Sequence, residues 1–225
     1  MIPEILYEDD AIIVVHKPAG MESQSGKSFS MDLCSFLKNR LARQGVRDPY
    51  IGVVHRLDRM VSGVMVYAKT REAAAKLSRQ VQNGQMEKHY KALLCGQIEP
   101  KEGMLVDYLL QNPKINCSAV AEPSAAGAKE ARLTYRQIPL EELGCILKGM
   151  PQVPDRSVTG VEIHLLTGRH HQIRVQFAHK GTPLFGDTKY NPAFQGKRSD
   201  RVALCAYRLS FRHPVTGKPM EFILK

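Results

Sequence analysis

Residues 54–70 read VHRLDRMVSGVMVYAKT and contain the features that decide the fold and the candidate site. The apolar run at residues 64–68 is rich in β-branched and aromatic residues, which is typical of a buried strand. A small-residue turn at Ser62-Gly63 precedes it, and basic residues surround one carboxylate, Asp58. Nearby cations favour the anionic form of a carboxylate. Asp58, at the mouth of a buried strand, therefore suits a nucleophile better than a proton donor.

A structural role is the alternative for this stretch. Asp58 could instead pair with an arginine where the strand begins, because structural ion pairs also place carboxylates among cations. The spacing His55-Arg56-Leu57-Asp58 by itself leaves both interpretations open.

The composition favours a polyanionic partner. The 225 residues include 32 Lys and Arg against 22 Asp and Glu, which gives a formal net charge of +10. Such a surface favours nucleic acid, although a soluble protein can be basic without binding it. The length allows one large domain or two small ones, each with a real core. We expect a single domain over residues 1–225.

Cysteine usage and hydropathy predict a soluble, cytoplasmic protein that does not associate with membranes. The five cysteines are widely spaced and form no C-x-x-C pair, which indicates free thiols in a reducing compartment. The opening residues Met1-Ile-Pro-Glu lead directly into a strand-like run, which predicts no signal peptide. No apolar run approaches the roughly 20 residues that span a bilayer.

The hydrophobic pattern predicts an α+β protein with a mixed, mostly antiparallel sheet and flanking helices. Strands are expected at residues 12–15, 64–68, 87–96, 131–138 and 161–166, and a hairpin within 203–224. Helices are expected over 31–43 after a Ser30 cap, from Thr70 to Asn83-Gly84, and over 170–180. Residues 99–130 lack apolar periodicity and predict a long excursion with one short strand at 104–109, and residues 147–157 predict a loop.

Two further stretches could carry chemistry. In TGRHHQIR, residues 167–174, cationic side chains open a predicted helix, where backbone N–H groups already favour anions. These side chains could bind phosphate or pair with a carboxylate. They could instead be solvent-exposed residues at the start of the helix. Adjacent histidines cannot both face one metal from a helix, so we expect no metal site.

In residues 88–91, KHYK, Tyr90 could stack on a base between cations, or be a core residue.

Together these stretches resemble the RluA-type pseudouridine synthases. The family's H-R-L-D motif, with its S-G and apolar strand, is similar to residues 55–69. Its lysine–tyrosine–alanine strand resembles residues 88–96, and its T-G-R-x-H-Q-I-R and G-D-x-x-Y motifs resemble residues 167–174 and 181–190. The opening residues 10–20 are similar to the family's first strand and loop. The four motifs occur in the family's order over nearly the whole chain.

The chain departs from the family pattern at a few positions. Val61 replaces a threonine, Gln176-Phe177 stands where His-Leu is common, and the usual continuation after Met21 is absent. No S4-type RNA-binding domain precedes the catalytic region, as in the stand-alone members. None of these departures affects the position of Asp58.

The resemblance implies the pseudouridine synthase fold with a central catalytic cleft, and a monomer that needs no cofactor and no obligatory protein partner. It implies isomerisation of specific uridines in structured rRNA or tRNA. Asp58 would be the catalytic carboxylate, Arg174 its ionic partner, and Tyr90 would stack on the flipped uracil. RNA-binding roles are expected for Lys17, His55, Arg56, Arg169 and His171. Two other hypotheses are an RNA-binding module without catalysis and a nucleosidase, which would release free uracil.

Overall fold

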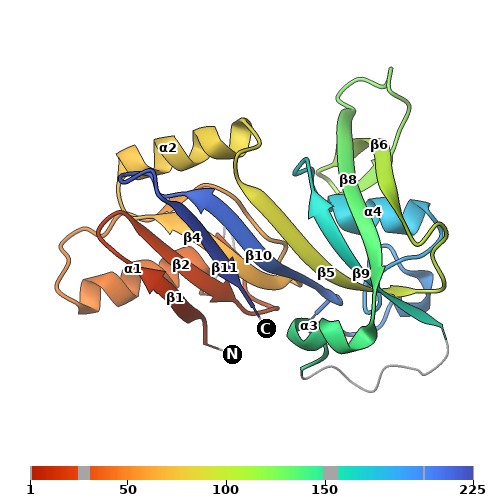
Figure 1. Cartoon of the computed structure of the whole chain (residues 1–225), viewed down its shortest axis with the longest axis horizontal. Coiled ribbons are helices and arrows are strands. Elements are labelled where there is room, and N and C mark those ends of the chain that lie inside the picture. Colours follow the sequence, from red (N-terminus) through yellow and green to blue (C-terminus); the bar gives the residue numbers. More distant parts are fainter. Residues whose placement is uncertain (1, 25–30, 149–156, 200, 225) are drawn as a thin grey trace. The chain divides into compact units, whose positions relative to one another are not determined.

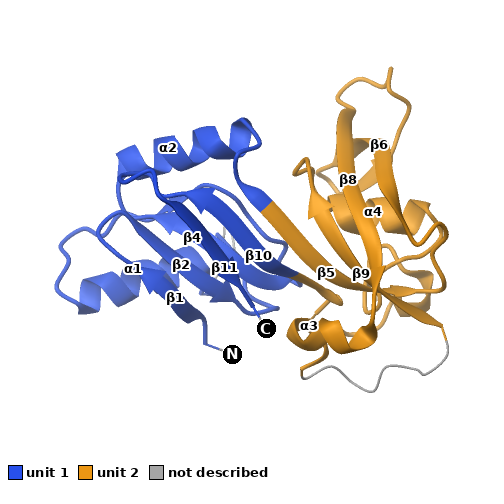
Figure 2. Ribbon diagram, in the orientation of Figure 1, with its two compact units in different colours: residues 1–87, 206–224 blue, residues 88–205, 225 orange. Residues whose placement is uncertain are grey.

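A computed structural model describes residues 2–24, 31–148, 157–199 and 201–224 of the chain. The chain forms two compact units, which Figure 2 colours separately. Unit 1 contains residues 1–87 and 206–224, and unit 2 contains residues 88–205. Each unit is described by itself, and a single catalytic domain over residues 1–225 stays a prediction.

Unit 1 is built on a sheet with the strand order β1-β2-β4-β10-β11, in which β3 also pairs with β4 (Figure 1). Its strands are β1 (Glu4–Glu8), β2 (Ile12–Lys17), β3 (Gly52–Val53), β4 (Ser62–Ala68), β10 (Leu204–Arg212, in unit 1 from Ala206 on) and β11 (Pro219–Ile223). The pairs β1/β2, β2/β4, β3/β4 and β10/β11 are antiparallel. The predicted strands at 12–15 and 64–68 and the predicted hairpin within 203–224 are confirmed.

The core of unit 1 lies between the central strands and α2 (Arg71–Gln82). Register places Val14 of β2 beside Val66 of β4, and both belong to one buried cluster with Leu77 of α2. The helix begins as predicted, because the side chain of Thr70 accepts a hydrogen bond of 3.1 Å from the N–H of Ala73. It ends at Asn83, also as predicted.

The start of β4 is closely packed against β10. The strand begins at Ser62, so the residues predicted as a turn are already part of the sheet. Gly63 has a φ of +146°, and a Cβ there would lie 2.5 Å from the carbonyl oxygen of Ala206 in β10. Only glycine permits this approach. The contact fixes the strand end that immediately follows the loop carrying Asp58.

The helix α1 (Leu33–Arg43) begins two residues later than predicted. Its N-cap is Asp32, whose carboxylate accepts a hydrogen bond of 2.7 Å from the N–H of Ser35. Ser30, the predicted cap, lies outside the described residues. The helical spacing itself is confirmed, because Leu33, Leu37 and Leu41 are all buried.

Unit 2 is built on an antiparallel sheet with the strand order β5-β9-β8-β6-β7. Its strands are β5 (Glu87–Cys95, in unit 2 from Lys88 on), β6 (Glu102–Asn112), β7 (Cys117–Val120), β8 (Lys129–Ile138) and β9 (Val158–Leu165). The predicted strands at 87–96, 131–138 and 161–166 are confirmed. The short strand predicted at 104–109 is confirmed as part of β6, but the long excursion predicted around it is wrong, because β6 and β7 occupy much of residues 99–130. Met104 and Val106 of β6 are about half exposed, so this strand lacks the pattern of a core element.

One face of this sheet is covered by α4 (Gln172–His179). The ring of Phe177 in α4 contacts Tyr135 of β8 edge-on, with 5.6 Å between ring centroids. The helix begins two residues later than predicted, because His171 has a left-handed backbone with a φ of +55°. Shorter helical segments are α3 (Gly144–Leu147) and the 3-10 turns η1 (Leu140–Leu143) and η2 (Pro192–Phe194). The loop predicted at 147–157 falls mostly outside the described residues.

The predicted α+β class with a mostly antiparallel sheet is confirmed. All five cysteines are free thiols, as expected. Throughout the described ranges, every helix is too short or too polar to span a bilayer.

Candidate active site

Asp58 lies in unit 1, on the loop between β3 and β4, and its side chain is partly buried. Ser23 fixes this loop beside Asp58: its hydroxyl donates to the carbonyl of Leu57 at 2.9 Å and accepts from the N–H of Leu57 at 3.1 Å. After Asp58 the chain turns back, because the N–H of Val61 donates to the carbonyl of Asp58 at 3.1 Å. These contacts give the carboxylate a defined position relative to the sheet.

Lys17, at the end of β2, lies beneath this loop rather than at the surface. Its side chain is fully buried, and Nζ donates to the carbonyls of Pro18, Met21 and Arg59 at 3.0, 2.7 and 3.3 Å. Burial lowers the pKa of this ammonium to about 7, although the charge of Asp58 acts in the opposite direction. Lys17 thus joins two loops, and the RNA contact expected for it stays a prediction.

The two residues that precede Leu57 differ in their surroundings. His55 is partly buried, and its Nε2 accepts a hydrogen bond of 3.1 Å from the N–H of Val66 in β4. That nitrogen therefore carries no proton, and the imidazole contributes to holding the Asp58 loop against β4. Arg56 is exposed, as a residue that contacts RNA must be.

Tyr90 lies on β5 in unit 2 and points to the face that α4 covers. Register places it opposite Ile163 of β9, which in turn lies opposite Tyr135, the residue that contacts α4. Since residues directly opposite one another point to the same face, Tyr90 and α4 share one side of the sheet. The side chain of Tyr90 is buried, at 6% exposure.

Arg174 lies in α4 and binds a second carboxylate, Asp187. Its Nε and Nη2 donate to Oδ2 and Oδ1 of Asp187, both at 2.8 Å, and both side chains are buried. Burial alone would raise the pKa of Asp187, but the hydrogen bonds and charge of Arg174 lower it below its usual value. The sequence places Asp187 in the motif at residues 181–190 but does not predict its contact with Arg174. Asp58 belongs to the other unit, and its pairing with Arg174 stays a prediction.

A network of polar and aromatic side chains surrounds Arg174. Its Cζ lies 5.1 Å from the ring centroid of Tyr190. The hydroxyl of Tyr190 accepts from the N–H of Ser118 at 2.8 Å and is hydrogen-bonded to Nδ1 of His171 at 2.7 Å. His171 is buried, at 9% exposure. Its side chain contacts the neighbours of Arg174, and the RNA contact expected for it stays a prediction.

Arg169 is exposed on the loop that precedes α4, in keeping with its expected role. Its Nε donates to the carbonyl of Glu130 at 2.7 Å, and its backbone N–H donates to the side chain of Gln172 at 3.0 Å. Gln176, where this chain departs from the family pattern, donates to the carboxylate of Asp107 at 2.8 Å and thereby joins α4 to β6.

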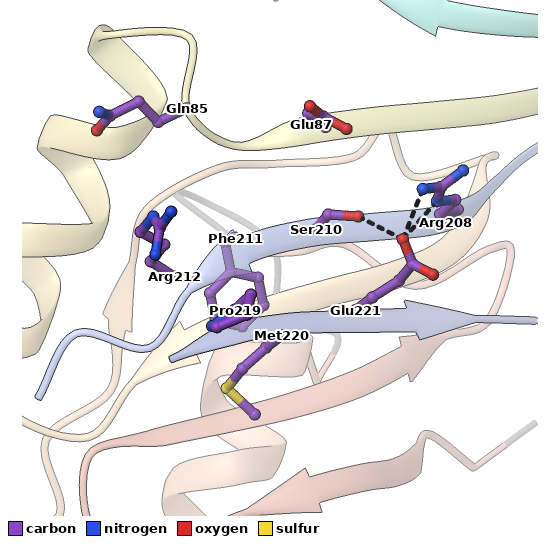
Figure 3. A pocket seen from close by; sticks show the side chains of 9 residues that line it. All are labelled: Gln85, Glu87, Arg208, Ser210, Phe211, Arg212, Pro219, Met220 and Glu221. Carbon is purple, nitrogen blue, oxygen red and sulfur yellow. Dashed lines mark hydrogen bonds and ion pairs between the residues drawn. The ribbon is translucent and has the colours of Figure 1, made fainter. Parts of the chain in front are cut away.

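A separate groove of about 300 Å³ lies in unit 1, along β10 and β11 (Figure 3). Figure 3 shows Arg208 and Ser210 directed at the carboxylate of Glu221, and this carboxylate neutralises the charge of Arg208 in the groove. The groove contains none of the predicted site residues. Within the described residues, no three His, Cys, Asp or Glu side chains form a group that could hold a metal ion.

Comparisons with known proteins agree with these motifs. The sequence profile described as RNA pseudouridylate synthase matches residues 11–179. The chain is 34% identical to the ribosomal large subunit pseudouridine synthase D of Pasteurella multocida, over 97% of this chain and 65% of that protein. It is 32% identical to the tRNA pseudouridine synthase C of Vibrio parahaemolyticus, over 99% of this chain and 89% of that protein.

A solved structure has the same fold. Human RNA Pseudouridylate Synthase Domain Containing 4 matches with a TM-score of 0.74 and 21% identity, over 99% of this chain and 88% of that chain. The chain spans less than two thirds of the length of the first curated relatives, at 65% and 59%.

Proposed function

Because the chain belongs to the RNA pseudouridylate synthase family, we propose that it isomerises specific uridines in structured RNA to pseudouridine. In this reaction the N1–C1′ bond breaks, the base turns, and C5 bonds to C1′ with loss of the C5 hydrogen. The reaction is redox-neutral and uses no group donor. The names of the relatives support ribosomal or transfer RNA as the class of substrate.

The observation that carries this proposal is that the matched motifs supply chemically suited side chains at defined positions. Asp58 lies on a loop held by buried hydrogen bonds at Ser23 and Lys17. Tyr90 and Arg174 lie on one side of the sheet of unit 2. An aromatic ring can stack on a flipped base, and the resemblance to the family implies a carboxylate and a guanidinium for the chemistry.

We assign the catalytic carboxylate to Asp58. Fixing its loop reduces the reorganisation needed when the carboxylate meets the ribose or the base. Arg174 would keep Asp58 ionised during catalysis. Asp187 binds the Nε–Nη2 edge of that guanidinium through two hydrogen bonds. Such a two-point contact requires an arginine, because lysine presents a single point charge.

The remaining roles concern the substrate. Tyr90 would stack on the flipped uracil, and base–aromatic stacking is worth about 1–3 kcal/mol. Arg56, which is exposed next to the Asp58 loop, would occupy the gap that the base leaves, offsetting an unstacking cost of a few kcal/mol. Arg169 would contact phosphates.

Tritium release tests this function. RNA labelled with tritium at uridine C5 is incubated with the wild-type protein, Asp58→Ala, Asp58→Asn and the control Asp10→Asn, which changes an exposed carboxylate of unit 1. We expect release by the wild type and the control only, with RNA binding unchanged in all four. Release by Asp58→Asn at the wild-type rate would remove Asp58 from the mechanism. Formation of free uracil would instead support a nucleosidase, and RNA binding without release a binding module.

A further inference from the structure

His171 has an unusual backbone conformation at the start of the helix that carries Arg174. Its φ of +55° lies in the left-handed region, which a residue with a Cβ adopts only rarely. Such conformations persist where surrounding contacts hold them, and they occur often at functional sites. His171 is the N-cap of α4, three residues before Arg174, so its backbone sets the direction in which the helix begins.

The ring of His171 is held on two sides. It stacks on His170 with 3.7 Å between centroids and 25° between planes, and it meets Tyr190 edge-on at 5.5 Å. Its Nδ1 is hydrogen-bonded to the hydroxyl of Tyr190 at 2.7 Å. That hydroxyl also accepts from the N–H of Ser118 in β7 at 2.8 Å. The tyrosine ring is thus fixed by contacts from both α4 and β7.

Tyr190 and Asp187 both hold the Arg174 guanidinium, each by a different contact. The two hydrogen bonds to Asp187 fix the guanidinium within its own plane. The ring of Tyr190, 5.1 Å from Cζ, lies within the distance at which a cation interacts with an aromatic ring. The N–H of Tyr190 also donates to Oδ1 of Asp187 at 3.2 Å, which links the two contacts.

We propose that His171 and Tyr190 form a clamp that positions Arg174 for catalysis, an inference that rests on the proposed function of Arg174. The left-handed turn at His171 directs the helix, and its imidazole fixes the hydroxyl of Tyr190. The ring of Tyr190 then holds the guanidinium that Asp187 orients. His171 and Tyr190 act through Arg174 and are positioning residues, with no contact to the reacting base.

Kinetics of four variants test the clamp. Tyr190→Leu removes the ring, Tyr190→Phe removes only the hydroxyl, and His171→Gly removes the imidazole but accepts a positive φ without strain. The control Tyr50→Leu removes the ring against which Arg71 lies, at 5.2 Å, in unit 1. Single-turnover tritium release is measured at saturating RNA, with RNA affinity and thermal stability measured in parallel.

We expect Tyr190→Leu to lower the rate at least tenfold, with the Kd for RNA within twofold of the wild type and the control unaffected. Tyr190→Phe and His171→Gly should show smaller losses, since both break the hydrogen bond between the Tyr190 hydroxyl and Nδ1 of His171. Their double variant should lose less than the product of the two single losses, because the effects of coupled residues do not add. Wild-type rates in Tyr190→Leu or His171→Gly, or additive losses in the double variant, would overturn the proposal.

A second readout does not depend on activity. The Nε–H of Arg174 is buried and bound to Asp187, so its NMR signal should exchange slowly with solvent; Arg174→Lys identifies the signal by removing it. Exchange should be at least tenfold faster in Tyr190→Leu and unchanged in Tyr50→Leu. Unchanged protection in Tyr190→Leu would overturn the clamp even if the enzyme is active. If the wild type releases no tritium from any RNA, the proposed function is wrong, but the exchange of the Arg174 Nε–H still tests the clamp.

Discussion

Replacing Asp187 with asparagine should destabilise the protein far more than breaking an ion pair at its surface. The substitution keeps the volume of the side chain, so it leaves no cavity. It removes the charge opposite Arg174, and one of the two oxygens that accept 2.8 Å hydrogen bonds becomes an NH₂ group. Asp187 is fully buried and Arg174 is 3% exposed, so solvent cannot compensate the remaining guanidinium.

The expected magnitude follows from this burial. Removing one partner of a buried pair costs about 3–5 kcal/mol, because the remaining charge loses the group that balances it. Asparagine retains one acceptor oxygen and Asp58 is the proposed second partner of Arg174, so we expect a loss near the lower limit, about 3 kcal/mol. That is roughly 150-fold in the folding equilibrium, at about 1.4 kcal/mol for each factor of ten. The matched control is Glu221→Gln, whose partner Arg208 is 34% exposed; this surface pair should contribute less than about 1 kcal/mol.

Urea titrations at neutral pH measure both variants. With a slope of about 1–3 kcal/mol per M, the midpoint of Asp187→Asn should fall by about 1–3 M at an unchanged slope. The pKa of Asp187 is lowered by folding, so its contribution is present above the unfolded value of about 3.9 and is lost as the pH falls through the folded value. The difference from the wild type should therefore shrink below about pH 4. A loss no larger than that of Glu221→Gln at neutral pH would refute the reasoning.

Three other predictions concern the cations of the site. The pKa of Lys17 is about 7 in the folded protein and about 10.4 when unfolded, so the unfolded state binds more protons between these values. The free energy of unfolding should then rise from pH 7 to 9 in the wild type relative to Lys17→Met, in parallel urea titrations; identical pH slopes would contradict this. Arg174→Lys should lower the rate of tritium release at least about tenfold, because an ammonium cannot reproduce the two parallel hydrogen bonds of the guanidinium. A wild-type rate in this variant would exclude a catalytic role for Arg174. Arg56→Ala and Arg169→Ala should each reduce the slope of log Kd for RNA against log salt by about 1, and an unchanged slope would place that residue outside the RNA contact.

Elements with a buried, regular pattern could be predicted from the sequence. The runs in β2 and β4 and the spacing of α2 are periodic because each packs against a core, and the Thr70 cap has a local chemical signal. The strand β6 gave only a partial signal, a short strand predicted at 104–109, since its outward residues Met104 and Val106 are exposed and backbone pairing with β8 defines its length. The spacing of apolar residues along one segment does not show which distant strand pairs with it.

The sequence predicts the residue types of the candidate site but not their contacts. Asp58, Tyr90 and Arg174 were identified through motifs whose order resembles a known family, and their joint role in catalysis stays a prediction. The role of Asp187 depends on a contact across 13 residues, which no local pattern reveals. Lys17 was expected to bind RNA, but it is buried, and three backbone carbonyls make a buried ammonium possible.

Unit 1 is built from two separate segments of the chain, residues 1–87 and 206–224, and this has a consequence for its synthesis on the ribosome. The strand β10, which lies beside β4, follows all of unit 2 in the chain. At about 5–20 residues per second, the apolar edge of β4 therefore waits on the order of 10 s for its neighbour. A nascent chain that stops between Arg174 and the end of unit 2 contains Asp58, Tyr90 and Arg174 but has an open sheet behind the Asp58 loop. We expect such truncated chains to need protection from aggregation and to be inactive despite carrying every proposed catalytic residue.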